Sequence, residues 1–164
     1  MADGFTVPAV WRDQPLPPGP VVIFDLDGVL SDAAGRQHYL AGPGRKDWDG
    51  FFAASGDDPI IEETARLLEL LDDELGVVLL TARPDTVRDA TLAWLARYGL
   101  RWDLLIMRAA KDWRPSPEVK REALRQLRDA GYDVRLAFED DRRNVDVFRA
   151  EGVPCLYVHS GYYE

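Results

Sequence analysis

Five short runs of apolar residues stand out along the chain, and each is followed closely by polar residues or a turn. They cover residues 21–26, 76–84, 102–107, 134–141 and 154–158. The first run, VVIFDL, is rich in β-branched and aromatic residues and shows no alternation of apolar with polar positions. This pattern is typical of a β-strand that is covered on both faces. The sequence therefore predicts five buried strands.

Stretches with helical periodicity separate these runs. Residues 60–73, 85–98, 117–130 and 142–151 carry apolar side chains three or four positions apart, and a glycine follows closely on each stretch, where helices commonly end. Strands that alternate with helices over short connections form a parallel sheet with helices on both faces. We therefore expect an α/β fold with a doubly wound, Rossmann-like parallel sheet of about five strands. Such a sheet binds ligands at the carboxyl ends of its strands.

Two segments fall outside this alternation. Residues 1–20 include four prolines between positions 15 and 20, which predict an extended, Pro-rich lead-in before the fold proper. Residues 31–58 are too long for a turn and too short for a separate domain, so we expect a small cap or rim insert and no large cap. The remaining length suits one hydrophobic core, and the prediction is a single domain over residues 21–164.

Composition narrows the function. No apolar run is long enough to cross a bilayer, and the first residues do not resemble a secretory signal, so we expect a cytoplasmic protein that acts without a membrane. The formal net charge of −9 argues against charge-driven coating of nucleic acid, although it permits binding of a single phosphate. The one cysteine, Cys155, lies in an apolar run and is expected in the core rather than in catalysis.

Residues suited to chemistry follow the predicted strands. At the strand ends or in the following helix stand Asp25, Asp27, Thr81, Arg83, Lys120, Glu139, Asp140 and Asp141. Crowded carboxylates raise one another's pKa unless a cation lies between them, and oxygen ligands alone suit Mg²⁺. Since a protein-bound Mg²⁺ commonly takes a substrate phosphate as a further ligand, the cluster predicts Mg²⁺-dependent phosphoryl transfer.

Each of the other polar residues has two interpretations, a role in this chemistry and an ordinary structural role. Thr81 can donate its hydroxyl to a phosphoryl oxygen, or it can cap the helix that begins near Pro84. Lys120 can neutralise charge in the transition state, or it can be a solvated surface charge, in which case Lys111 is the rival. Arg83 can clamp a phosphate, or it can belong to a solvated basic rim. That rim would also include Arg108, Lys111, Arg114, Arg142 and Arg143.

Four segments of the chain resemble, in order, the four motifs of the haloacid dehalogenase (HAD) superfamily of phosphatases. They are FDLDGVLSD, LLTARP, a downstream Lys and FEDDRRNV. The resemblance implies that Asp25 is the nucleophile and Asp27 the general acid and base, with Asp25 and the backbone carbonyl of Asp27 on the metal. It also implies Thr81 as phosphate donor and Lys120 as charge neutraliser. The motif-four metal ligand would be Asp140, supported by Asp141 or Asn144.

A closer resemblance covers, in order, TARPDTVRDATLAWLARYGLRWDLLIMR, RPSPEVKREAL and LAFEDDRRNVDVFRAEGVPCLYVHSG. These stretches are similar to the 3′-phosphatase domain of phage polynucleotide kinase/phosphatase, which implies a phosphorylated DNA or RNA 3′ end as substrate and a separate kinase or ligase as neighbouring enzyme. Independently of this resemblance, substrate contacts are expected at Arg83, Gly28 and Ala82 and, from the insert, at Arg36. Where that domain carries an acidic residue four positions before the Lys, this chain has Ser116.

Other functions remain open at this stage. A nucleotidase or a small-metabolite phosphatase would use the same residues. A phospho-accepting receiver also uses an acidic pair, a Thr and a Lys, but there the acidic pair ends the first strand and the phosphorylated Asp ends a later one. A binding module without catalysis would retain the fold and lose the metal. The sequence leaves the oligomeric state open.

Overall fold

The computed structural model describes residues 4–163; residues 1–3 of the predicted lead-in and Glu164 lie outside the described residues. Its sheet has six strands in the order β1-β4-β3-β2-β5-β6. Their bounds are β1 Ala9–Trp11, β2 Pro20–Phe24, β3 Gly76–Pro84, β4 Leu104–Arg108, β5 Asp133–Glu139 and β6 Cys155–Tyr157. The five strands from β2 to β6 are parallel and correspond to the five predicted runs. The doubly wound α/β fold is confirmed.

The sixth strand was not predicted. Ala9–Trp11 pairs antiparallel with β4 at one edge of the sheet, and Phe5 and Ala9 are buried in the core. The segment before the prolines is therefore part of the fold, although the sequence placed the start of the fold after them. Strand β1 covers the edge of β4, which would otherwise present unpaired backbone groups.

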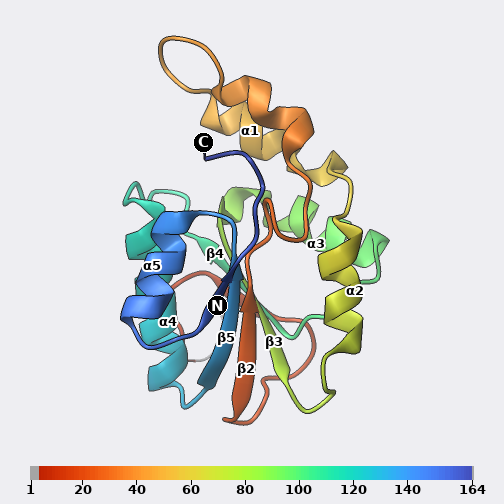
Figure 1. The fold of residues 1–164 in the computed structure, drawn as a ribbon, viewed down its shortest axis with the longest axis vertical. Helices are drawn as coiled ribbons and strands as arrows, with labels where there is room; N and C mark the ends of the chain where they lie inside the picture. Colours follow the sequence, from red (N-terminus) through yellow and green to blue (C-terminus); the bar gives the residue numbers. More distant parts are fainter. Residues whose placement is uncertain (1–3, 164) are drawn as a thin grey trace.

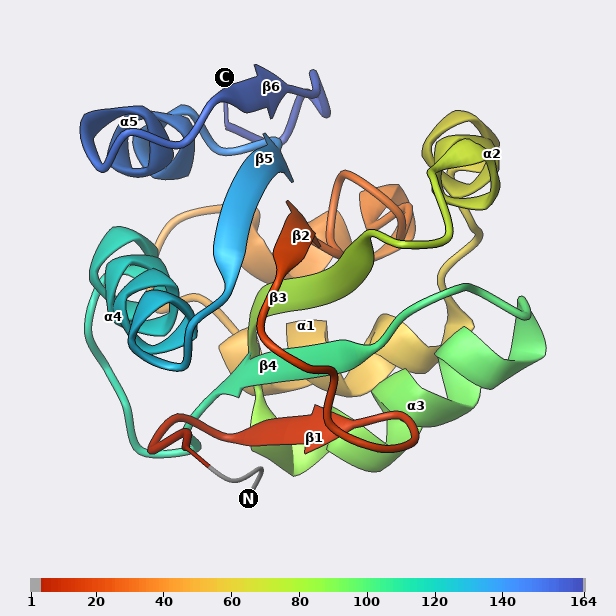
Figure 2. The same ribbon diagram turned by 90° about the horizontal axis from the view of Figure 1, so that it is seen from below.

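Four longer helices cover the two faces of the sheet. They are α2 Glu62–Leu70, α3 Arg88–Arg97, α4 Ser116–Asp129 and α5 Arg142–Ala150, each within three residues of its predicted range at both ends. Alternate side chains of β2 lie on opposite faces of the sheet. Val21 and Ile23 pack with α4 and α5, while Val22 and Phe24 pack with α2 and α3. Figure 2 shows the sheet between these two pairs of helices. None of the helices in the described part of the chain combines the length and apolar character that a bilayer crossing requires.

The predicted insert is small. Between β2 and α2 the chain forms the 3₁₀ helix η1 (Ala34–Leu40), the short helix α1 (Trp48–Ala53) and the 3₁₀ turn η2 (Ala54–Asp57). This unit lies beyond the carboxyl end of the sheet, and the C-terminal segment runs up beside it (Figure 1). Within the insert Trp48 stacks on Phe52, and Phe51 is buried.

Candidate active site

The carboxyl ends of β2 and β5 bring three carboxyl groups together. The two strands are adjacent and parallel, with Phe24 opposite Phe138, so the residues that follow, Asp25 and Glu139, lie side by side. One oxygen from each of Asp25, Glu139 and Asp140 lies within 4.8 Å of the other two, and all three residues are buried. The strand order reverses between β2 and β5, which is where doubly wound sheets bind their ligands.

Lys120 provides a cation for this cluster. It lies on α4 and is only 1% exposed. Its Nζ lies 3.0 Å from Asp25 Oδ1 and donates a hydrogen bond of 2.5 Å to Glu139 Oε2. Burial opposes a charged amine, but the charges of Asp25 and Glu139 outweigh it and raise the pKa of Lys120 above its ordinary value. Lys111 is exposed in the loop between β4 and α4, so Lys120 is the lysine that reaches Asp25.

One lysine does not balance three carboxyl groups. Burial, followed by the charge of Glu139, raises the pKa of Asp25 well above its ordinary value and raises the pKa of Asp140 to about 7. Neither carboxyl oxygen of Asp140 makes a hydrogen bond of normal geometry among residues 4–163, although the side chains of Ser160 and Asp25 are close enough to lower its pKa. Buried polar atoms are almost always paired, and buried carboxylates without partners commonly bind metals. The all-oxygen donor set therefore fits a hard divalent cation held by Asp25 and Asp140.

Gly28 makes room for Asp140. Its φ is +81°, and a Cβ added there would lie 2.1 Å from Asp140 Oδ2. The Gly28 N–H donates to the carbonyl of Ser31 at 2.9 Å, which holds the turn after the Asp25 strand. Glycine is needed on two counts, because the backbone is left-handed and because the Asp140 carboxylate approaches it closely.

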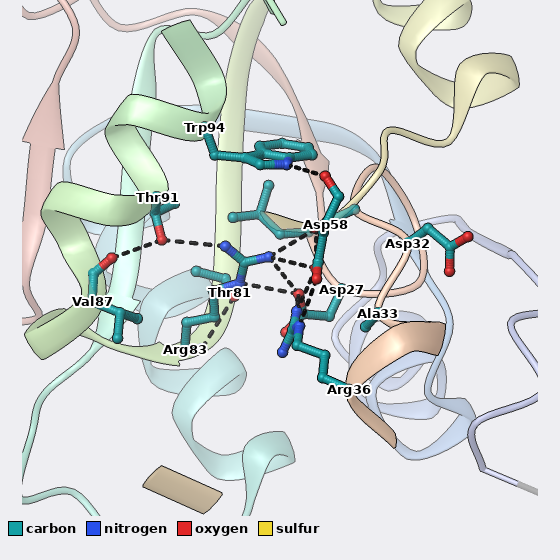
Figure 3. Close-up of polar contacts among 12 residues, drawn as sticks. Asp27, Asp32, Ala33, Arg36, Asp58, Thr81, Arg83, Val87, Thr91 and Trp94 are labelled. Atoms are coloured by element: carbon teal, nitrogen blue, oxygen red, sulfur yellow. Dashed lines mark hydrogen bonds and ion pairs between the residues drawn. The ribbon is translucent and has the colours of Figure 1, made fainter. Parts of the chain in front are cut away.

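Two buried arginines hold Asp27 (Figure 3). Asp27 Oδ1 accepts hydrogen bonds of 2.6 Å from Arg36 Nη2, 2.6 Å from Arg83 Nη2 and 3.0 Å from Arg83 Nε. Burial opposes ionisation of Asp27, but the charges of Arg83 and Arg36 outweigh it and lower its pKa. Asp27 is thus an ionised carboxylate in this arrangement, and both arginines are buried site residues rather than part of a solvated rim.

Asp58 anchors the two arginines and was not among the predicted residues. Its carboxylate accepts hydrogen bonds from Arg36 Nε at 2.8 Å and Nη2 at 2.7 Å, and lies 3.6 Å from Arg83 Nη2. Its backbone carbonyl accepts a hydrogen bond of 2.8 Å from Trp94 Nε1 on α3 (Figure 3). Two guanidinium groups are therefore balanced by two carboxylates. Asp58 follows Asp57 in a polar segment, and the sequence gives no reason to prefer either carboxylate, so only the need to balance buried arginines signals its role.

Strand β3 places Thr81 and Ala82 at the carboxyl end of the sheet, near Asp25 and Asp27. Thr81 is buried, and its Oγ1 accepts a hydrogen bond of 3.1 Å from the backbone N–H of Arg83, which leaves the hydroxyl hydrogen available. Helix α3 begins at Arg88 with Val87 as its N-cap, so Thr81 does not cap it. The Ala82 carbonyl accepts a hydrogen bond of 3.1 Å from Arg108 Nε. Contact of Thr81 or Ala82 with substrate stays a prediction.

Asp141 lies next to the carboxylate cluster without joining it. It is the N-cap of α5: its Oδ1 accepts a hydrogen bond of 3.0 Å from the Arg143 N–H, and its Oδ2 lies 2.7 Å from Arg143 Nη2. Asn144 exchanges hydrogen bonds with Ser116. The geometry thus places Glu139, rather than Asp141, beside Asp25 and Asp140. The expected ligation through the Asp27 carbonyl stays a prediction.

The fold and this arrangement of groups together define a phosphatase of the haloacid dehalogenase type. Residues 19–163 match the family model described as the polynucleotide kinase PNKP phosphatase domain. The chain belongs to this family. Comparison with curated proteins gave no match.

Solved structures agree with this assignment. In two structures of a Pnkp1/Rnl/Hen1 complex, one described as an RNA repair complex, a chain is similar to this one with 29% and 30% identity and TM-scores of 0.74 and 0.73. These matches cover 92% and 91% of this chain but 45% and 49% of the solved chains, so the chain spans about half their length. A class C acid phosphatase from Bacillus anthracis with tungstate bound shares the fold, with a TM-score of 0.63 at 16% identity over 90% of this chain and 69% of its own.

Proposed function

We propose that this phosphatase is Mg²⁺-dependent, acts through a phosphoryl-aspartate on Asp25 and removes 3′-phosphates from nucleic-acid ends. The observation that carries the chemistry is the position of Asp25. It lies between the Lys120 ammonium and the unpaired carboxylate of Asp140, and Asp27 follows two residues later. The bound cation would supply positive charge to the phosphate oxygens and to the crowded carboxylates.

The reaction then proceeds in two steps. In the first, an oxygen of Asp25 attacks phosphorus, the bond from phosphorus to the ester oxygen breaks, and Asp27 gives a proton to that oxygen. In the second, Asp27 takes a proton from water, whose oxygen attacks phosphorus, and the bond to Asp25 breaks to release inorganic phosphate. Lys120 and the Thr81 hydroxyl stabilise the negative charge that develops on the phosphoryl oxygens.

The arginine pair controls the proton on Asp27. While Arg36 and Arg83 both contact its carboxylate, protonation is disfavoured. Asp27 must carry a proton when the leaving group departs, so we infer that the substrate phosphate draws at least one guanidinium group away from it. Arginine suits this exchange, because its planar donors pair with carboxylate and phosphate equally well.

Two observations support a nucleic-acid end as the substrate: the family to which the chain belongs and the small size of the insert. The chain belongs to the polynucleotide kinase phosphatase-domain family, and its insert, which spans only η1, α1 and η2, leaves space for a large substrate that presents one terminal phosphate. The similarity to a chain of an RNA repair complex supports action beside other end-processing enzymes such as a kinase or ligase.

The test is phosphate release from four kinds of substrate: a 3′-phosphate oligonucleotide, a 5′-phosphate oligonucleotide, mononucleotides and an aryl phosphate. We expect preference for the 3′-phosphate end, dependence on Mg²⁺ with loss in excess EDTA, and no turnover by Asp25→Asn. Asp13→Asn is the matched control, since it removes the same charge from an exposed position.

Each outcome has a defined meaning. Preference for mononucleotides would make the protein a nucleotidase and refute the 3′-end assignment while leaving the chemistry intact. Turnover that survives Asp25→Asn would refute the nucleophile. Acid quenching followed by mass spectrometry of a peptide containing Asp25 should detect the phosphoryl group during turnover, and its absence at saturating substrate under rapid quenching would argue against a covalent intermediate.

A further inference from the structure

Trp113 is the most exposed large apolar side chain of the described residues, with 86% of its surface open to solvent. It lies in the loop formed by residues 109–115, between the carboxyl end of β4 and the start of α4. Among residues 4–163 its indole stacks on no other ring and its Nε1 makes no hydrogen bond. A tryptophan in this state leaves a large apolar surface in water, which is typical of a residue that binds a partner.

The loop that carries Trp113 is held in a fixed shape. The Arg108 guanidinium donates hydrogen bonds through Nη1 to the carbonyls of Asp112, at 3.0 Å, and Arg114, at 2.6 Å. The Asp112 carboxylate pairs with the Arg114 guanidinium at 2.7 Å and also accepts the Arg114 N–H at 3.1 Å. The backbone on both sides of Trp113 is thus braced by side chains. Its exposure is built into the loop rather than being the result of an unstructured chain.

The same loop is fastened to the active site at both ends. Arg108 Nε donates a hydrogen bond to the carbonyl of Ala82, the residue after Thr81. On the other side, α4 begins at Ser116 and one turn later carries Lys120, which reaches Asp25. Three residues of chain and one helical turn separate Trp113 from Lys120, which limits the distance between their Cα atoms to roughly 16 Å. Trp113 therefore lies beyond the carboxyl end of β4, within reach of a nucleotide bound next to a phosphate at Asp25.

The charge around Trp113 selects the kind of partner. The chain has a formal net charge of −9, yet residues 108–114 hold three cations, Arg108, Lys111 and Arg114, and one carboxylate, Asp112, although Glu118 and Glu122 of α4 also act on Arg114. An exposed aromatic ring among cations matches the two requirements of single-stranded nucleic acid, a π surface for a base and positive charge for the backbone. Trp48, on the insert, differs, because its ring is already packed against Phe51 and Phe52.

We propose that Trp113 is a base-stacking platform that holds the nucleotides next to the terminal 3′-phosphate, an inference that rests on the proposed function. It makes no contact with the reacting atoms and acts on affinity for the polynucleotide. Because any base has a π face, this contact favours polynucleotide over small phosphate esters without selecting a sequence.

The test compares Trp113→Ala with wild type on a 3′-phosphorylated single-stranded oligonucleotide and on an aryl phosphate. Loss of one base-stacking contact should raise KM for the oligonucleotide by about 5- to 150-fold. Values of kcat on both substrates and KM for the aryl phosphate should stay within twofold. Trp113→Phe, which keeps a ring, should restore most of the affinity. DNA and RNA oligonucleotides of the same sequence are run side by side, and a preference between them identifies the natural strand.

Leu70→Ala is the matched control, because Leu70 is 74% exposed and ends α2, which leads into the amino end of β3. An unchanged oligonucleotide KM in Trp113→Ala would overturn the inference. If the wild-type protein does not hydrolyse the 3′-phosphate, the proposed function is wrong, but the role of Trp113 can still be tested. Fluorescence anisotropy then measures the affinity of a labelled oligonucleotide for the Asp25→Asn variant with and without Trp113→Ala. Weaker binding by the Asp25→Asn/Trp113→Ala double variant than by Asp25→Asn alone would support base stacking on Trp113, and equal binding would refute it.

Discussion

Replacing Asp58 by asparagine tests whether the buried network around Asp27 supports both stability and catalysis. The substitution keeps the shape of the side chain and removes one of the two negative charges that balance Arg36 and Arg83. Asp58 is 4% exposed and accepts two hydrogen bonds from Arg36 and one of 2.5 Å from Ser31 Oγ. Removal of one partner from a buried ion pair costs about 3–5 kcal/mol. For a domain of this size, that lowers Tm by roughly 6–20 °C.

The effect on turnover follows from the same contacts. With Asp58 neutral, the guanidinium group of Arg36 loses the carboxylate that fixes its position beside Asp27. A displacement of a positioning group by about 1 Å costs on the order of 100-fold in rate. We expect a loss of this order in kcat for an aryl phosphate, measured in Mg²⁺ at a temperature where the variant is folded.

Asp57→Asn is the matched control, since Asp57 is the exposed neighbour and loses the same charge. It should melt within about 2 °C of wild type, because exposed substitutions change stability little. The reasoning would be refuted by an Asp58→Asn variant that melts together with the Asp57→Asn control and retains its kcat.

Three further results are expected. Gly28→Ala should abolish activity and weaken Mg²⁺ binding, because the added methyl group takes the space of the Asp140 carboxylate in addition to the strain of a left-handed alanine. In EDTA, stability should fall as pH rises from about 4 to 7, because native Asp140, with a pKa of about 7 against an ordinary 3.8, binds a proton that the unfolded chain has lost. Mg²⁺ should therefore raise Tm more at pH 8 than at pH 5. Cys155, whose thiol pKa is raised to about 11 by burial and then by Glu139, should resist iodoacetamide in the native protein at pH 8, where about one thiol in a thousand is ionised, and react fully in denaturant.

These experiments carry their own checks. For Gly28→Ala, titration calorimetry with Mg²⁺ showing wild-type affinity would contradict the close approach to Asp140. Thermal melts at the two pH values that show equal gains from Mg²⁺ would mean that the carboxylate cluster holds no extra proton. Mass spectrometry that finds rapid alkylation of native Cys155 would place the thiol at the surface.

The sequence predicts the parallel part of the fold because each buried strand carries its own local signal. Strand β1 is as short as β6, which was predicted, but Ala9–Trp11 lies before the prolines at 15–20 and pairs antiparallel with β4, which begins at Leu104. Its place in the sheet depends on that distant partner, and no local periodicity reveals the pairing.

The candidate site divides in the same way. Asp25 and Asp27 are recognisable because they stand together at a strand end, and Lys120 because of its order relative to the other motifs. Asp141 illustrates the limit: an aspartate just before a helix is equally typical of a metal ligand and of an N-cap, and the structure shows the cap while metal ligation by Asp141 stays a prediction. Asp58 illustrates a second limit of sequence-based prediction, because it is needed to balance charge only once the fold has buried Arg36 and Arg83 beside it.

The ion pairs that hold the insert against the domain determine how substrate can enter the active site and how product can leave it. Arg36 near the start of the insert and Asp58 at its end are joined to each other, and Arg36 also joins Asp27 on the body of the domain. Lifting the insert would separate Arg36 from Asp27 and Asp58 from Arg83, a change whose cost is comparable to a large part of the stability of a small domain. We therefore expect the insert to act as a fixed wall rather than as a hinged lid. On this expectation, substrate and product exchange without a closure step, and kcat is set by chemistry or by phosphate release.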